Sequence, residues 1–184
     1  MPSTELLTAQ RNEKLAFGLC LLTMLGLFAF TLATYADLPA RYPVHFSLDG
    51  QPNRWTSKDW VSWLVIPLTG LFIWLMMLGS AGLVNWARKH PKHLSMPYKK
   101  RFLELPEEKQ APVWQIIRNM MHWISLPTLL MMVYAQYSTW QVARGAWKLM
   151  KSGPIFVLLG LVCLVTILCI VGMVRAIRRA LETN

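Results

Sequence analysis

Apolar and polar residues in this sequence are segregated into long blocks rather than mixed at short intervals. Four blocks are rich in apolar residues, at about residues 15–36, 60–86, 116–140 and 155–174. A helix rises about 1.5 Å per residue, so each block is long enough to cross a hydrocarbon core of roughly 30 Å. The pattern predicts an all-α membrane protein, a four-transmembrane-helix bundle that forms a single integral-membrane domain over residues 1–184.

Composition and charge placement support this interpretation. The chain is 54% hydrophobic and 15% charged, with a mean hydropathy of +0.35, which is outside the usual range of soluble domains. Thirteen Lys and Arg residues lie on the side of the two termini, and six lie on the opposite side. The positive-inside rule therefore predicts that both termini are cytoplasmic and that the first and third loops face outward.

The polar segment between the first two blocks, residues 37–60, has a pattern of its own. Positions 44–48 alternate between apolar and polar residues, which predicts a short strand with one apolar face. Asp49 and Gly50 follow as a turn signal. Pro52 lacks an amide hydrogen, so we expect it to limit any return strand.

The end of the same segment resembles a helix start. The string Thr56-Ser57-Lys58-Asp59 has the form of a capping box directly before the apolar block at Trp60. We therefore expect Thr56 to cap the second helix and Asp59 to reach back toward it.

The residues of this loop also carry a resemblance to a known family. The matching residues are Leu38, Pro39, Pro43, Val44, His45, Phe46, Gly50, Pro52, Asn53, Arg54, Trp55 and Lys58. Their order and spacing resemble the signature, here residues 38–58, of a bacterial integral-membrane family of unknown function, numbered sixteen-forty-eight among such domains. The same unit is found at the N-terminus of Sdp-type toxin immunity proteins. Tyr42 stands where that family has an aliphatic residue, and Asn53 stands where Asp is common.

The resemblance implies an immunity-protein-like, multi-pass protein of the bacterial cytoplasmic (inner) membrane. It implies that the signature loop is either structural or partner-binding. His45 is the residue on which the two interpretations differ most. With Asp37 or Asp49 it could form a metal site or a pH-sensitive pair, whereas a structural His would bond to groups within the loop. Because no second ligand stands at a useful spacing, we predict no metal and no cofactor.

A second group of polar residues precedes and enters the third apolar block. Gln115, Asn119 and His122 recur at helical spacing, with Arg118 beside them. Ionisable groups inside a bilayer usually have a function, so this stripe could line a cavity or a proton path. Its position near the cytoplasmic end favours the alternative that it lies in the headgroup layer.

Known catalytic motifs are missing from the sequence, so we predict a protein that is not an enzyme. The net charge of +10 is explained by cations that flank the apolar blocks, so no nucleic-acid partner is expected. The favoured function is recognition of a peptide or protein partner, or service as a subunit of a membrane complex. The lipid bilayer is a partner in both cases, and the sequence does not decide whether the chain forms an oligomer. The alternative is a small transporter or channel built around helices kinked at Pro67 and Pro127.

Overall fold

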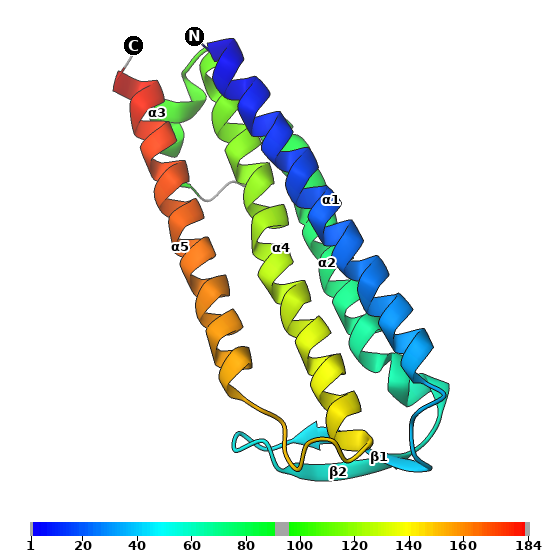
Figure 1. The fold of residues 1–184 in the computed structure, drawn as a ribbon. Coiled ribbons are helices and arrows are strands. Elements are labelled where there is room, and N and C mark those ends of the chain that lie inside the picture. Colours follow the sequence, from blue (N-terminus) through cyan, green and yellow to red (C-terminus); the bar gives the residue numbers. More distant parts are fainter. Residues whose placement is uncertain (1, 91–95, 183–184) are drawn as a thin grey trace.

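The computed structural model describes residues 2–90 and 96–182. Four long helices run side by side, and a small hairpin lies across one end of the bundle (Figure 1). The helices are α1 (Pro2–Thr34), α2 (Trp60–Lys89), α4 (Glu107–Ala143) and α5 (Gly153–Glu182), with the short α3 (Lys99–Leu103) at the other end. The hairpin consists of β1 (Arg41–Phe46) and β2 (Pro52–Ser57). The mostly helical prediction is confirmed, and the strand and turn expected in the first loop are present.

Helix α4 is the central helix, because it packs against α1, α2 and α5. The polar side chains of α4 are turned into these contacts. Eight of them are buried: Gln115, Asn119, His122, Ser125, Gln136, Ser138, Thr139 and Gln141. The neighbouring helices therefore shield these polar groups from the surroundings, which is the condition under which a membrane bundle tolerates them.

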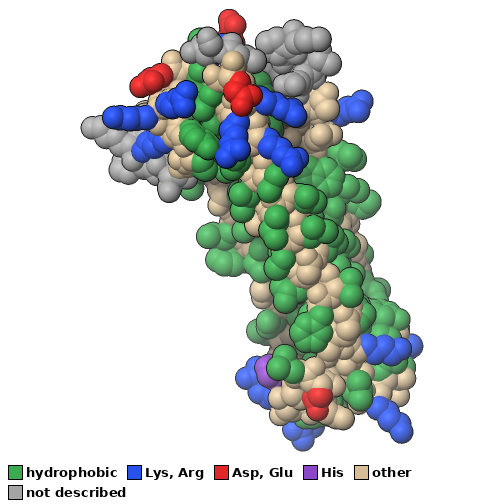
Figure 2. Space-filling model, turned by 90° about the vertical axis from the view of Figure 1, so that its left-hand side faces the viewer, with side chains coloured by type: hydrophobic (Ala, Val, Ile, Leu, Met, Phe, Trp, Pro, Cys, Tyr) green, Lys and Arg blue, Asp and Glu red, His purple; other side chains and the backbone are tan. Residues whose placement is uncertain are grey.

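Three helices are long and apolar enough to cross a membrane: Leu7–Thr34 within α1, Trp60–Lys89 and Gly153–Glu182. They indicate a membrane protein. The predicted block 116–140 falls in α4, which is not among these three, because its buried polar residues lower its hydropathy. The prediction of four spans is therefore confirmed for three helices only. Figure 2 shows hydrophobic side chains along the middle of the molecule, with Lys and Arg gathered at both ends.

The outer surface of α5 is apolar along most of its length. None of the residues in its most hydrophobic window is buried, and large side chains such as Val157 and Leu168 are 72% and 60% exposed. An exposed apolar surface of this length would be costly in water. Lipid chains around α5 remove that cost, so the exposed residues also support a membrane setting.

The return strand corrects one sequence expectation. β1 pairs antiparallel with β2, and the register runs from Arg41 opposite Ser57 to Phe46 opposite Pro52. The expectation that Pro52 would limit the return strand is wrong. Pro52 is the first residue of β2, a position at which a missing amide hydrogen is tolerated. The register shifts twice, between Pro43 and His45 and again between His45 and Phe46.

The predicted start of α2 at Trp60 is confirmed, but its capping residue differs from the expectation. Thr56 lies within β2, and the N-cap is Asp59, whose carboxylate accepts a hydrogen bond from the Ser62 amide at 2.8 Å. This bond lowers the pKa of Asp59. Thr56, which the capping-box pattern assigned to the start of the helix, is therefore part of the strand. Both α2 and α4 continue as helix through Pro67 and Pro127.

Candidate functional site

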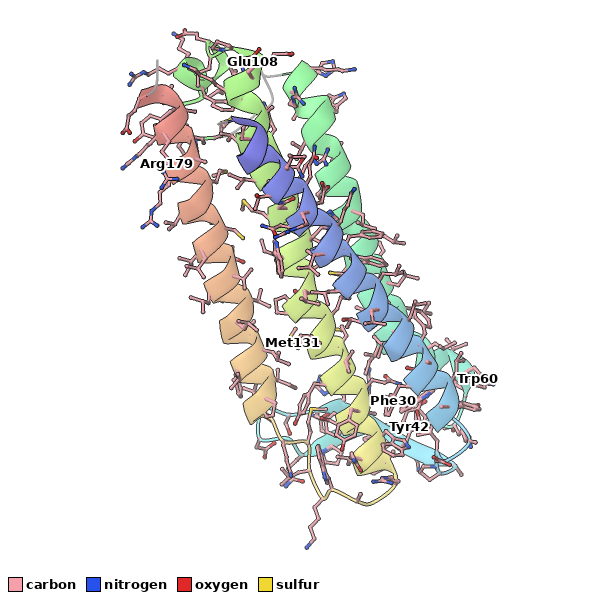
Figure 3. All side chains as sticks on the ribbon, turned by 45° about the horizontal axis from the view of Figure 1, so that its top comes forward. Phe30, Tyr42, Trp60, Glu108, Met131 and Arg179 are labelled. Atoms are coloured by element: carbon pink, nitrogen blue, oxygen red, sulfur yellow. The ribbon has the colours of Figure 1, made fainter. Side chains whose placement is uncertain are left out.

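The hairpin is seated on a small core of aromatic side chains at the end of the bundle. Tyr42 of β1 and Trp63 of α2 are each only 1% exposed, and their rings meet edge to face with centroids 5.4 Å apart. The Trp63 indole donates to the Thr31 carbonyl oxygen at 2.8 Å. Burial raises the pKa of Tyr42 to about 12, so its phenol stays neutral. Figure 3 places Tyr42 and Trp60 at this end and Arg179 and Glu108 at the other.

Lys58, the last residue of the family signature, joins the hairpin to the end of α1. Its ammonium group donates to the carbonyl oxygens of Ala36 and Leu38, each at 3.0 Å. It also lies 5.0 Å from the centre of the Tyr35 ring, which stacks on Trp60 at 3.5 Å. A cation in this position satisfies carbonyl groups that follow the end of a helix. Lys58 therefore fastens the loop.

Gly50 attaches the hairpin turn to the loop between α4 and α5. The Met150 amide donates to the Gly50 carbonyl oxygen at 2.9 Å. Gly50 has a φ of +83°, and a Cβ atom at this position would overlap the Met150 carbonyl oxygen. Glycine is therefore required here for both its conformation and its lack of a side chain.

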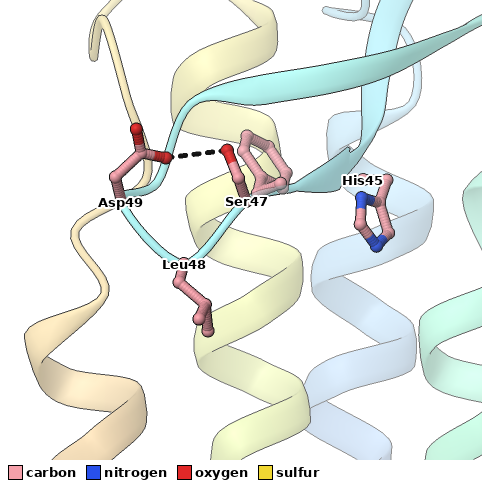
Figure 4. A pocket seen from close by; sticks show the side chains of 5 residues that line it. His45, Ser47, Leu48 and Asp49 are labelled. Carbon is pink, nitrogen blue, oxygen red and sulfur yellow. Dashed lines mark hydrogen bonds between the residues drawn. The ribbon is translucent and has the colours of Figure 1, made fainter.

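His45 bonds within the hairpin. Its Nδ1 lies 2.6 Å from Oδ1 of Asn53, across the two strands. Asp49, the proposed alternative partner, instead accepts from the Ser47 hydroxyl at 2.7 Å and the Gln51 amide at 3.1 Å (Figure 4). These bonds lower the pKa of Asp49. His45 thus has the contact expected of a structural residue.

A metal site is not formed around His45. Within residues 2–90 and 96–182, no group of three or more His, Cys, Asp or Glu side chains could hold a metal ion. A shallow open pocket is present instead, lined by His45, Phe46, Ser47, Leu48 and Asp49. Leu48 is 84% exposed and projects from the turn in Figure 4.

The remaining signature residues divide between two faces of the hairpin. Pro43 is buried, and Pro39, Phe46 and Pro52 are half-buried. Asn53, Arg54 and Trp55 are exposed on β2, with Trp55 46% exposed. The signature therefore combines side chains that hold the hairpin with side chains that are free to meet another molecule.

Residues 22–71 match the family model described as "Domain of unknown function (DUF1648)". This segment is similar to the DUF1648 family, and it makes up 50 of the 184 residues. The family resemblance predicted from the loop residues is thereby confirmed, and the match extends it into α1 and α2. No curated protein and no solved structure matches the chain in the same comparisons.

The DUF1648 segment thus contains the hairpin, the last part of α1 and the first part of α2. Its anchors include residues that the signature did not mark. Trp63 and Thr31 lie in the segment, whereas Met150 lies outside it. The sequence does not mark Trp63 as an anchor, because a buried indole and an interfacial one have the same spacing along a helix.

A second polar cluster lies outside the DUF1648 segment, between α1 and α4. Glu13 accepts from Arg118 at 2.7 Å and from Gln115 at 2.6 Å through its Oε2 atom. Nε2 of His122 lies 3.7 Å from Oε1 of Glu13, and Asn119 donates to the Ala9 carbonyl oxygen at 2.7 Å. The polar stripe therefore packs against α1, and its place at headgroup depth stays a prediction.

Sequence reasoning missed Glu13, the residue that organises this cluster. It is separated from its partners by about a hundred positions, and its own neighbourhood along the chain has no unusual pattern. Only the packing of α1 on α4 brings the carboxylate to Arg118. A half-buried carboxylate that accepts from the Arg118 guanidinium and the Gln115 amide is a self-contained helix contact, so the hairpin is the stronger candidate site.

Proposed function

We propose that this protein is a non-catalytic, multi-pass protein of the bacterial cytoplasmic membrane that recognises a peptide or protein partner with its hairpin. In this proposal all four long helices cross the membrane, both termini are cytoplasmic and the hairpin lies outside. The excess of Lys and Arg at the end opposite the hairpin favours that orientation. The buried polar side chains of α4 are compatible with a fourth span, because the other helices cover them.

The division of the hairpin into a fastened face and an exposed face carries the proposal. Buried Tyr42, the Lys58 contacts and the Gly50–Met150 bond hold the hairpin in one position. Arg54 and Trp55 project from this support, and they are residue types that contribute strongly to protein interfaces. A fixed loop loses little conformational entropy on binding, which favours affinity. The resemblance of the loop to the toxin immunity unit supports a peptide or protein ligand.

The test is affinity purification of the full-length protein from native membranes in a mild detergent. Wild type, Arg54→Ala, Trp55→Ala and Arg88→Ala are compared, and the proteins that elute with each are identified. Arg88 is an exposed cation near the C-terminal end of α2, so it controls for the loss of a positive charge. We expect a specific partner with wild type and Arg88→Ala that is lost with the two hairpin variants. Equal recovery of every co-eluting protein from all four samples would refute the proposal.

Transport is the second candidate, and the buried polar residues of α4 favour it. These residues form two groups along the helix, at residues 115–125 and 136–141. Between them lies an apolar cluster that includes Leu27, Trp74 and Leu129. A solute would have to cross this layer, which makes transport the weaker candidate. It predicts a flux into proteoliposomes that falls when Pro67 or Pro127 is replaced; an absence of flux across a broad panel of solutes would contradict it.

A further inference from the structure

The two strands of the hairpin have different surroundings. β1 packs against α4, and its residues Tyr42 and Pro43 are buried. β2 is exposed over most of its length. The sheet contains the two strands in the order β1-β2, so one side of β2 faces β1 and no strand of the described chain lies on the other. Such an edge presents unpaired backbone N–H and C=O groups.

The geometry of the ladder identifies the backbone groups on this free edge. The Lys58 amide donates to the Ala40 carbonyl oxygen at 2.9 Å, and hydrogen-bonded pairs alternate with non-hydrogen-bonded pairs along an antiparallel ladder. Trp55 stands opposite Pro43, a non-hydrogen-bonded position that suits a residue without an amide hydrogen. By the same alternation, the amide and carbonyl groups of Trp55 and Ser57 face the free edge.

Charges near the edge favour an acidic occupant. The hairpin end of the protein, residues 35–59 and 144–152, carries six Lys and Arg but only three Asp. Two of these carboxylates, Asp49 and Asp59, are occupied in hydrogen bonds with their own turn and helix. Arg54 on β2 has no ion-pair partner among the described residues. A second copy of this hairpin would bring cations together, so pairing between copies is disfavoured.

We infer that β2 binds an extended, acidic segment of a partner protein as a third strand. Backbone groups of Trp55 and Ser57 pair with the backbone of the added strand, as in other cases of strand addition. Arg54 pairs with a carboxylate of that strand, and the exposed ring of Trp55 covers one of its side chains. The inference rests on the proposed function and names the chemistry of its partner. Six residues of β2 give an edge of roughly 20 Å.

The test measures binding of two labelled ten-residue peptides to the full-length protein in nanodiscs of zwitterionic lipid. One peptide alternates Glu with Val, and the other has Lys in place of each Glu. Fluorescence anisotropy gives the affinity of each peptide for wild type, Ser57→Ala, Ser57→Pro and Arg54→Glu. The Pro variant removes an amide on the free edge, whereas the Ala variant removes only the hydroxyl group and keeps that amide.

We expect wild type and Ser57→Ala to bind the acidic peptide equally and the basic peptide much more weakly. Loss of one edge hydrogen bond in Ser57→Pro weakens binding about threefold to tenfold, and the charge reversal in Arg54→Glu weakens it by about tenfold or more. If the melting temperature of Ser57→Pro differs from that of Ser57→Ala, the comparison is made with Trp55→Pro and Trp55→Ala.

Three results would overturn the inference. One is equal affinity of the Pro and Ala variants; if Arg54→Glu still weakens binding, the proposed recognition function survives without strand addition. Another is failure of wild type to bind the acidic peptide. The proposed function is then tested separately, by the purification from native membranes. The last is loss of peptide binding when the nanodiscs contain phosphatidylglycerol. This result would show that the Lys and Arg residues of the hairpin end bind lipid headgroups rather than the peptide.

Discussion

Substitution of Gly50 by Ala tests whether the hairpin is fastened to the loop between α4 and α5. The change forces a non-glycine residue to a φ of +83° and places its Cβ against the Met150 carbonyl oxygen. The left-handed conformation costs about 1–2 kcal/mol, and loss of the Met150–Gly50 hydrogen bond adds about 1 kcal/mol. Because the obstacle is backbone rather than a flexible side chain, we expect a total loss of about 2–3 kcal/mol.

Gly145 provides the matched control. Its φ of +77° is similar, but a Cβ atom there meets nothing within 4 Å. Gly145→Ala therefore costs only the conformational part, about 1–2 kcal/mol. Replacement by Asn, which tolerates the left-handed region, should restore stability at position 145 but not at position 50.

The assay is thermal unfolding of the purified protein in detergent, followed by near-ultraviolet circular dichroism. A difference of 1 kcal/mol corresponds to about 2–4 °C for a chain of this size, so Gly50→Ala should melt at least that far below Gly145→Ala. Hydrogen exchange at the Met150 amide should also rise in Gly50→Ala alone. Equal melting temperatures for the two Ala variants, with unchanged exchange at Met150, would show that the reasoning about this contact is wrong.

Three further predictions concern the other anchors. Trp63→Phe removes the 2.8 Å indole bond to the buried Thr31 carbonyl oxygen and leaves it only the 3.4 Å bond from the Thr34 hydroxyl, so we expect a loss of about 1–2 kcal/mol in thermal unfolding. The Ser62 amide lowers the pKa of Asp59. The stabilising contribution of the Asp59 carboxylate is therefore present above the ordinary carboxyl pKa and is lost as pH falls through the lowered pKa. Asp59→Asn should reduce the loss of stability at acid pH in an unfolding titration. The effects of Glu13→Gln and of replacing Arg118 on the free energy of unfolding should be coupled by about 0.5–3 kcal/mol in a double-mutant cycle. Additive effects would exclude the ion pair as a stabilising contact.

The sequence predicted the helices well, because long apolar blocks are a local property. It also predicted a strand over residues 44–48 and a turn at Asp49-Gly50; the turn is present, but β1 begins earlier, at Arg41, and ends at Phe46. It failed at Pro52, since the rule that proline interrupts a sheet does not apply to the first residue of an edge strand. It assigned Thr56 to the helix because a capping-box string does not reveal that a neighbouring strand claims the same residue.

The contacts that build the candidate site were harder to predict, because they join distant parts of the chain. The signature marked Lys58 and Gly50, but their partners are backbone groups of Ala36, Leu38 and Met150. Any residue type supplies such groups, so no pattern reveals them. The partner of Gln115 and Arg118 was missed for the same reason, since Glu13 meets them only through helix packing.

Photo-crosslinking in native membranes tests the central claim most directly, which is that the exposed face of the hairpin meets a partner. A crosslinking amino acid replaces Trp55 in one sample and Phe72 in another; Phe72 is 64% exposed on α2 and belongs to a candidate span. The account predicts a discrete peptide or protein adduct at position 55 that is absent at position 72. No adduct at position 55, or the same products at both positions, would contradict it.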